Sequence, residues 1–324
     1  MVGRFRRAAV IGGGYMGGGI AQTLAIAELD CTLVDADADL AEASVKRLHG
    51  EAKHYEALGL FPTGAYERVQ HHLSAATTLE DAAGEADFVA EAVPEDAGLK
   101  KEVLRRVSSA ARPDAVITSN TSAIPIHELA SSVAHPERFL GAHWMNPAFF
   151  VPCVEVIPTE ATDGAVIEDV MRLLRDADKR PTLVSDSPGF VANRLQYALF
   201  RECARLVEEG IAEPAQIDEV VSNSFGFRLP FFGPFAIADI AGLDVYCGGF
   251  ATMETAYGER MSAPPLLTDH VSTGRLGVKS RGGFYTFDEH AASDVASYRD
   301  RAYSRLSSLR QELGNLDLQP GQAS

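Results

Sequence analysis

The glycine-rich segment near the start of the chain constrains the fold more than any other feature. Gly12, Gly14 and Gly17 take the glycine positions of the pattern G-x-G-x-x-G in the segment G-G-G-Y-M-G. The pattern alone is weak evidence, because a chain with 28 glycines contains such matches by chance. Here it follows an apolar segment, residues 5–11, and precedes a helix-forming one, residues 20–29. This strand–turn–helix context predicts a turn that binds a dinucleotide.

The glycines of this turn meet three separate physical requirements. Gly12 permits a tight turn, Gly14 lets the backbone approach a pyrophosphate, and Gly17 allows the helix to pack closely against the strand. The free N–H groups and the positive end of the helix dipole then face the phosphates. Tyr15 and Met16 lie inside the same turn, and we expect them to contact the cofactor as well.

An acid stands at the end of the next apolar segment, where a dinucleotide-binding unit requires one. Asp35 closes the segment C-T-L-V-D and can accept hydrogen bonds from a ribose diol. Asp37 and Asp39 follow, and no arginine is adjacent, so a 2′-phosphate would be repelled. The sequence therefore predicts NAD rather than NADP. The alternative, a glycine-rich turn with an unrelated solvated aspartate, does not explain why all these features stand in register.

Apolar segments alternate with helical ones through the first half of the chain. Further strands are expected at residues 31–35, 86–93, 115–120, 138–143, 153–158 and 180–186. Helical segments are expected between several of them, at residues 37–60, 95–110 and 163–178. This alternation predicts an α/β fold, with a Rossmann-type, doubly wound and mainly parallel sheet that carries helices on both faces.

The pattern changes near residue 187, where strand alternation gives way to helical periodicity. Ser187 suits an N-cap and Pro188 suits the first helical position, so one long amphipathic helix is expected to end at Gly210. Further helical patterns follow at residues 214–224, 234–257 and 290–313. The sequence thus predicts a dinucleotide-binding domain, residues 1–186, and an all-helical C-terminal domain, residues 187–324.

The charge and the cysteines limit the classes of partner. The net charge is −16, from 45 acidic and 29 basic residues, which argues against a nucleic-acid or anionic-membrane surface. The four cysteines form no C-x-x-C pair, so neither a disulfide framework nor a metal site is expected, and the cytoplasm is the default location. No apolar stretch reaches the ~18 residues of a membrane-spanning helix.

The segment G-A-H-W-M-N-P-A-F-F-V-P-C-V-E-V places a glutamate inside an apolar run, which is costly unless the carboxylate has a partner. His143 should end a strand at the carboxyl edge of the sheet, where ligands of such sheets bind. If the next strand folds back, Glu155 meets the imidazole, fixes its tautomer and stabilises its protonated form. The alternative, a surface histidine and an unrelated glutamate, is the one that spacing alone favours.

Six segments resemble the 3-hydroxyacyl-CoA dehydrogenase family in their residues, their order and their separation along the chain. They are GGGYMGGGIA, EAVPE, SNTSAIPI, RFLGAHWMNP with the later VEV, DSPGFVANRL and GRLGVKSRGGFY. The resemblance covers nearly the whole chain. It implies a dinucleotide-binding domain followed by an all-helical domain that binds substrate and commonly forms a homodimer.

The resemblance also implies roles for individual residues. The catalytic histidine of the family falls on His143 and its partner glutamate on Glu155. The hydroxyl that helps to hold the substrate oxygen falls on Ser122, and the active-site asparagine falls on Asn193. The implied reaction moves the proton of a 3-hydroxyl group to His143 and its hydride to NAD⁺, as in fatty acid metabolism.

Other residues match positions of the family at the cofactor. Glu95 and Lys100 correspond to residues that border the nicotinamide. Asn120 and Asn146 lie in the same motifs, and Asn120 is expected at the cofactor. The alternative for Asn120 is a residue that only shapes a turn, and for Asn146 one that only ends a strand.

The sequence departs from the usual family pattern before V-E-V, where Pro152 takes the place of a lysine. A proline there resembles the branch of the family that acts on free 3-hydroxy acids such as gulonate or carnitine, as does the arginine-rich segment after residue 290. GRLGVKSRGGFY instead resembles the acyl-CoA members. A 3-hydroxyacyl-CoA is therefore the first substrate hypothesis and a small free 3-hydroxy acid the second. A non-catalytic dinucleotide-binding protein is a third, disfavoured because His143 and Glu155 are both present.

Overall fold

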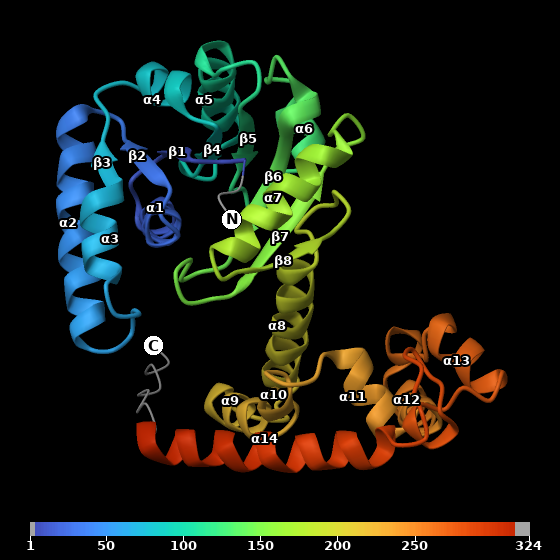
Figure 1. Cartoon of the computed structure of the whole chain (residues 1–324). Coiled ribbons are helices and arrows are strands. Elements are labelled where there is room, and N and C mark those ends of the chain that lie inside the picture. Colours follow the sequence, from blue (N-terminus) through green and yellow to red (C-terminus); the bar gives the residue numbers. More distant parts are fainter. Residues whose placement is uncertain (1–3, 315–324) are drawn as a thin grey trace. The chain divides into compact units, whose positions relative to one another are not determined.

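The computed structural model describes residues 4–314 and divides the chain into two compact units (Figure 1). The division falls between Phe200 and Arg201, inside the helix α8, which spans Ala192–Glu208. The domain boundary predicted at residue 187 lies just before this helix. The two units are described separately below.

The first unit contains an eight-stranded sheet within residues 4–314, with strand order β3-β2-β1-β4-β5-β6-β7-β8. The strands are β1 (Arg7–Ile11), β2 (Asp30–Val34), β3 (Leu73–Ala75), β4 (Phe88–Glu91), β5 (Val116–Ser119), β6 (Phe139–Trp144), β7 (Cys153–Pro158) and β8 (Arg180–Leu183). Neighbouring strands are parallel except β6 and β7, which are antiparallel. The short β3 was not expected from the sequence.

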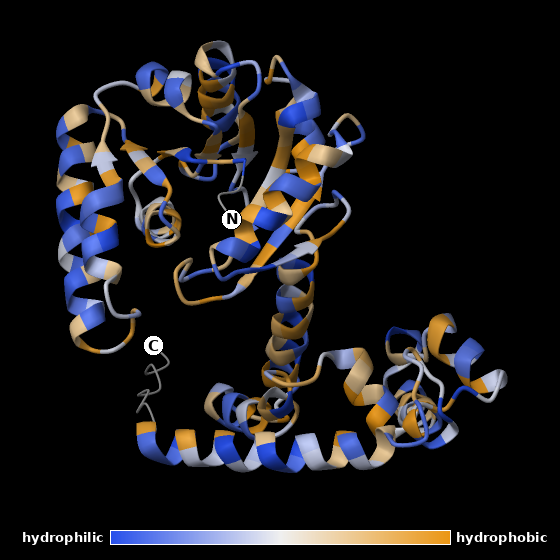
Figure 2. Cartoon of the chain, viewed as in Figure 1, coloured by the Kyte–Doolittle hydropathy of each residue, from blue (hydrophilic) through white to orange (hydrophobic). Residues whose placement is uncertain are grey.

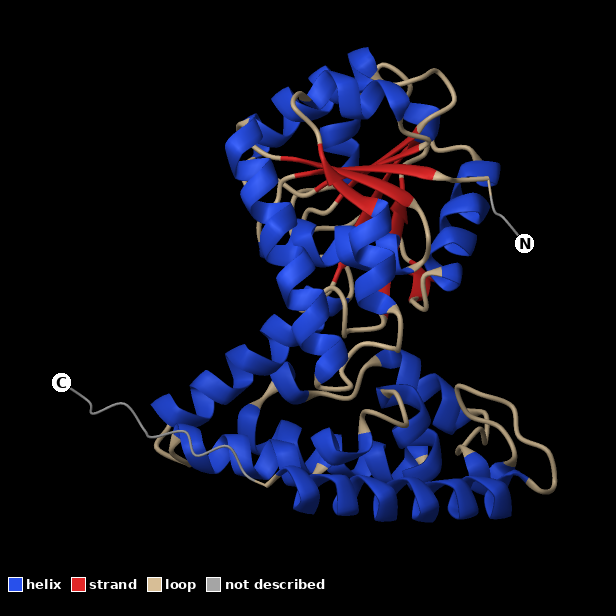
Figure 3. Ribbon diagram, turned by 60° about the vertical axis from the view of Figure 1, so that its left-hand side comes forward, coloured by secondary structure: helices blue, strands red, loops and turns tan. Residues whose placement is uncertain are grey.

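Helices cover both faces of this sheet (Figure 3), so the predicted doubly wound fold is confirmed. They are α1 (Tyr15–Ile26), α2 (Ala38–Ala57), α3 (Ala65–His72), α4 (Leu79–Glu85), α5 (Ala97–Ala110), α6 (Ile126–Ala130), the 3₁₀ turn η1 (Pro136–Arg138) and α7 (Gly164–Asp176). The sequence predicted α1, α2, α5 and α7 but missed the short α3, α4 and α6. A helix of one or two turns shows too few apolar repeats to be recognised by periodicity.

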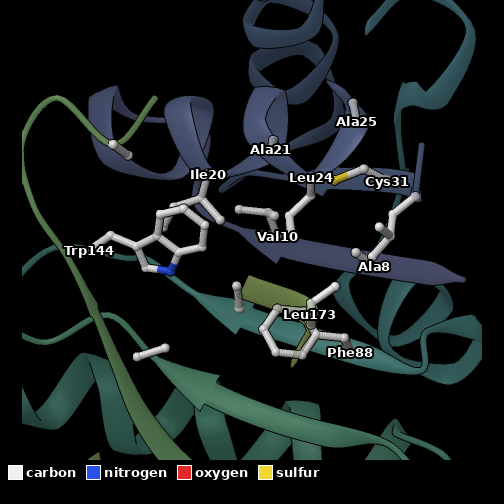
Figure 4. Close-up of a cluster of buried hydrophobic side chains, with 14 of the residues drawn as sticks. Ala8, Val10, Ile20, Ala21, Leu24, Ala25, Cys31, Phe88, Trp144 and Leu173 are labelled. Carbon is white, nitrogen blue, oxygen red and sulfur yellow. The ribbon is translucent and has the colours of Figure 1, made fainter. Parts of the chain in front are cut away.

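The core of the first unit lies on both sides of the sheet. Val10 belongs to the cluster under α1, whereas its neighbour Ile11 belongs to the cluster under α5. Successive side chains of a strand point to opposite faces, so a strand covered on both sides must be apolar throughout. Figure 4 shows Ile20 and Leu24 of α1 above Val10 and Phe88 of the sheet. Each such side chain contributes about 1.5–3 kcal/mol on full burial.

The second unit is helical, as predicted. After α8 it contains α9 (Pro214–Asn223), α10 (Phe225–Arg228), α11 (Pro234–Ala241), α12 (Leu243–Tyr257), η2 (Glu259–Met261), α13 (Pro265–Ser272), η3 (Val278–Ser280) and α14 (Ala291–Leu313). Its small core is formed by Ala238, Leu243 and Leu267. Figure 2 shows many hydrophilic residues along α2 and α14, while apolar residues gather in strands such as β6 and β7.

Two predicted helices differ from the structure. The helix expected from Ser187 begins at Ala192, because Gly189 (φ +73°) and the buried Phe190 (φ +48°) adopt left-handed backbone conformations, which a right-handed helix cannot include. The helix expected over residues 234–257 is two helices, bent by 100° at Gly242, whose φ is +104°. Within residues 4–314, no single helix is long and apolar enough to cross a membrane.

Candidate active site

The glycine turn has the geometry that its sequence predicts. Gly12 has a φ of +108°, and a Cβ atom there would lie 2.7 Å from the Ala92 carbonyl oxygen. A Cβ atom on Gly17 would lie 1.8 Å from the Gly12 carbonyl oxygen, so helix α1 can approach the turn only with glycine at that position. A Cβ atom on Gly14 would meet nothing within 4 Å. Gly14 therefore presents open backbone at the start of α1.

A cavity of about 900 Å³ lies at the carboxyl ends of β1, β2, β4 and β5. This is the edge of a doubly wound sheet where ligands bind, and β1 and β4 form the point at which the strand order reverses. The volume is at the upper end of the range for ligand pockets. Eight of the predicted site residues line it: Gly12, Gly14, Tyr15, Met16, Asp35, Glu95, Asn120 and Ser122. The residues present fit a dinucleotide.

The carboxylate of Asp35 is anchored to the glycine turn. Its Oδ2 atom accepts a hydrogen bond from Gly13 N at 3.0 Å, and Oδ1 accepts one from Ala36 N at 2.8 Å. Behind the turn, Arg47 of α2 donates from Nη2 to the Gly13 carbonyl oxygen at 2.9 Å. The sequence analysis missed Arg47, because it is distant from the turn in the chain and close to it only in space. Asp37 serves as the N-cap of α2.

Lys100 lies below the cavity wall, fully buried, and does not line the cavity. Its Nζ atom donates to Glu91 Oε1 at 2.8 Å and to the Val93 carbonyl oxygen at 3.1 Å, and lies 3.5 Å from Glu95 Oε2. Glu91, also fully buried, accepts a further hydrogen bond from Ser119 Oγ. The sequence analysis overlooked Glu91, although an acid inside the apolar run F-V-A-E-A-V is the same signal that drew attention to Glu155.

Glu95 connects this buried pair to the loop after β5. Its Oε1 atom accepts hydrogen bonds from Thr121 Oγ1 at 2.6 Å, Ser122 N at 2.9 Å and Ala123 N at 3.0 Å. Burial alone would raise the pKa of Glu95, but these hydrogen bonds and the charge of Lys100 together hold the pKa below its usual value. The carboxylate is therefore charged at neutral pH.

His143 and Glu155 stand opposite each other on the antiparallel strands β6 and β7. The distance from His143 Nδ1 to Glu155 Oε2 is 2.8 Å, and the two residues are only 4% and 2% exposed. The other oxygen of Glu155 accepts hydrogen bonds from Val191 N at 2.9 Å and Ala192 N at 3.0 Å, at the start of α8. The buried carboxylate thus has three donors, which offsets the cost of removing it from water.

Two asparagines join the cavity wall to the histidine and to α8. Asn120 Oδ1 accepts a hydrogen bond from Trp144 N at 2.9 Å, directly after His143. Asn193 Nδ2 donates to the carbonyl oxygen of Ser122 at 2.8 Å. His143, Glu155, Asn193 and Gly17 do not line the dinucleotide cavity themselves. Asn146 is exposed in the loop after β6.

Within the described residues, no group of three or more His, Cys, Asp or Glu side chains is placed to hold a metal ion.

Comparison with known proteins identifies the family of the chain. The model of the NAD-binding domain of 3-hydroxyacyl-CoA dehydrogenase matches residues 7–187, and the model of the C-terminal domain of the same enzyme matches residues 189–287. The predicted cofactor, NAD, and the prediction of an NAD-dependent dehydrogenase are therefore confirmed. The two matches also adjoin at the predicted domain boundary.

Relatives of the chain carry two different kinds of name. A probable 3-hydroxybutyryl-CoA dehydrogenase of Bacillus subtilis is 37% identical over 281 residues, covering 86% of this chain and 96% of that protein. The 5-formyl-3-hydroxy-2-methylpyridine 4-carboxylate 5-dehydrogenase of Mesorhizobium japonicum is 33% identical over 298 residues, covering 91% of this chain and 95% of that protein. The crystal structure of a 3-hydroxyacyl-CoA dehydrogenase from Archaeoglobus fulgidus is 30% identical and aligns with a TM-score of 0.77, covering 95% of this chain and 99% of that chain. On this evidence the chain belongs to the 3-hydroxyacyl-CoA dehydrogenase family of NAD-dependent oxidoreductases.

Proposed function

We propose that this protein interconverts a 3-hydroxyacyl-CoA and a 3-oxoacyl-CoA, with His143 and Glu155 as a proton-transfer dyad. The hydrogen bond of 2.8 Å between the two side chains carries the proposal, because it binds a proton carrier to a buried carboxylate. The dyad adjoins the dinucleotide cavity through Asn120, whose side chain holds the residue after His143.

Each group has one task in this mechanism. Bound NAD⁺ supplies the hydride acceptor. The hydrogen bond to Glu155 assigns the proton of the neutral ring to Nδ1, so Nε2 of His143 is the atom that accepts the substrate hydroxyl proton. Glu155 then stabilises the protonated ring. Ser122 and Asn193 hold the substrate oxygen, and in reduction His143 returns the proton to the ketone.

The same chemistry on a small free 3-hydroxy acid is the second candidate. Pro152 supports it, since the acyl-CoA members of the family usually carry a lysine at that position. The Mesorhizobium japonicum relative supports it too, because its name describes a carboxylate and no coenzyme A thioester.

The substrate class is tested by following NADH consumption with acetoacetyl-CoA and, separately, with free 3-oxo acids. We expect turnover of the thioester. Turnover of the free acids alone would reject the first candidate in favour of the second. No turnover of either would favour a dinucleotide-binding protein without catalytic activity.

We further propose a homodimer that acts in the cytoplasm in fatty acid metabolism. Helix α8 supports the dimer, because none of its residues is buried although it carries large apolar side chains such as Leu195, Tyr197 and Phe200. The four unpaired cysteines support a reducing compartment.

Asp35→Ala should weaken NAD⁺ binding by about 10- to 100-fold, because hydrogen bonds to a charged group are worth about 1.5–3 kcal/mol each. The affinity for NADP⁺ should fall less, since removal of the carboxylate also removes its repulsion of the 2′-phosphate. Dissociation constants from calorimetric titration check this. Glu67→Ala, which removes a negative charge from the exposed first turn of α3 and away from the cavity, is the control. Equal losses for both cofactors would exclude contact between Asp35 and the ribose.

Glu155→Gln should slow turnover less than removal of the histidine does. The amide oxygen can still accept from Val191 N and Ala192 N. The amide NH2 group then faces His143 Nδ1 in place of an acceptor, and the uncharged amide no longer favours the protonated ring. We therefore expect the pH–rate profile for oxidation to move toward lower pH, measured as kcat across pH 5 to 10. A profile that stays in place would argue that the carboxylate only holds the start of α8.

A further inference from the structure

The cavity wall carries three carboxylates, and two of them have an evident partner. Asp35 accepts a hydrogen bond from Gly13 N in the glycine turn, and we expect it to bind the adenosine ribose. Glu80 forms a two-point ion pair with Arg106, with nitrogen–oxygen distances of 2.9 and 3.1 Å. The third, Glu95, has a side chain that is 39% exposed toward the cavity and solvent.

Among residues 4–314, Lys100 is the cation that lies within 4 Å of the Glu95 carboxylate, and it does not neutralise that charge. Lys100 Nζ lies 3.5 Å from Glu95 but 2.8 Å from Glu91, and both Lys100 and Glu91 are fully buried. Two carboxylates thus share one ammonium group, which leaves one net negative charge. Of these three side chains, Glu95 is the one that lines the cavity, so the net negative charge faces the cavity.

The strand order decides which part of the coenzyme meets this charge. Asp35 follows β2 and marks the adenosine ribose, and the glycine turn after β1 takes the phosphates. The remaining part of the cavity lies over the ends of β4 and β5, where Glu95 and Asn120 stand. Asn120 binds the backbone beside His143, which must be close to the reacting carbon. The nicotinamide therefore lies at the Glu95 end.

The nicotinamide ring is a cation in NAD⁺ and neutral in NADH. A fixed carboxylate beside the ring attracts the oxidised form and has no comparable attraction for the reduced form. We propose that Glu95 raises the affinity of the site for NAD⁺ relative to its affinity for NADH, compared with the same site without this charge. The inference rests on the proposed function for the position of the nicotinamide near His143, and the substrate plays no part in its test.

The test compares Glu95→Gln with Glu80→Gln. In Glu95→Gln the amide oxygen can still accept from Thr121 and the loop backbone. The negative charge is lost, and the amide NH2 group takes the place of Oε2 near Lys100. Glu80→Gln removes the same charge from the adenosine end of the same cavity. The dissociation constants of NAD⁺ and NADH are measured without substrate, by calorimetry and by NADH fluorescence.

We expect the ratio of the NADH to the NAD⁺ dissociation constant to fall about tenfold in Glu95→Gln, equal to about 1.4 kcal/mol, and to stay unchanged in Glu80→Gln. An unchanged ratio in Glu95→Gln, or an equal fall in both variants, would overturn the proposal.

A second measurement needs no substitution and covers the case in which Glu95→Gln fails to fold. Benzamide adenine dinucleotide has the shape of NAD⁺ but an uncharged ring. The unaltered protein should bind it about tenfold less tightly than NAD⁺, and equal affinity would count against the role of Glu95. Because no hydroxyacyl substrate is present, these outcomes are independent of whether the proposed turnover is observed.

Discussion

Replacing His143 by alanine should lower kcat by about 10²- to 10⁴-fold, the usual contribution of a positioned acid–base group. The affinity for NAD⁺ should stay nearly the same, because His143 does not line the dinucleotide cavity. Glu155 would keep its hydrogen bonds from Val191 N and Ala192 N, so the strand pair and the start of α8 should remain in place. Steady-state kinetics and a calorimetric NAD⁺ titration measure the two effects.

His135→Ala is the matched control for this substitution. His135 lies just before β6, its side chain is 50% exposed, and its partner Glu137 is on the surface. Loss of that imidazole should leave kcat near its original value. Full activity of His143→Ala would remove the dyad from the mechanism, and a parallel loss of NAD⁺ affinity would point to a disturbed fold.

Replacing Lys100 by methionine should lower the free energy of unfolding of the first unit by about 3–5 kcal/mol. The loss leaves the carboxylate of Glu91, which has no exposed surface, without its charged partner. Urea unfolding followed by the fluorescence of Trp144 checks this, because this single tryptophan is buried in the core of that unit. Lys101→Met, at the neighbouring and less buried position, should change the value by about 0.5 kcal/mol at most.

The double variant Glu91→Gln with Lys100→Met separates charge pairing from packing. A buried ion pair can often be replaced by uncharged residues of similar size at little cost. Much of the lost stability should therefore return in the double variant. If the double variant loses as much unfolding free energy as Lys100→Met alone, the packing of the Lys100 side chain explains the effect and the ion pair does not.

The dinucleotide turn could be predicted from the sequence because its requirements are local. Backbone angles and close contacts within a few residues require glycine at positions such as Gly12 and Gly17, and Gly14 lies in the same turn. Asp35 follows at the end of the next strand. The order of apolar segments likewise predicted the sheet and the helical second unit. Helix starts were predicted less well: a buried Phe190 in a left-handed conformation moved the start of α8 to Ala192, and this depends on what the side chain packs against.

The meeting of His143 and Glu155 illustrates where the sequence reaches its limit. Spacing alone favoured two unrelated residues, and only the antiparallel pairing of β6 with β7 places them opposite each other. Lys100 shows a related limit: its position in a motif suggested a place near the cofactor, and only the structure shows the ion pair that it forms with the buried Glu91.

By itself, the sequence determined the turn, the acid, the fold class and the family, because each depends on the order of residues or on angles within a short segment. Only the tertiary structure decided which charges are paired, buried or left open, as for Glu95 at the cavity and Arg47 behind the glycine turn. The reason is physical: electrostatic energies depend on distance through space and on exclusion of water, and neither quantity follows from separation along the chain.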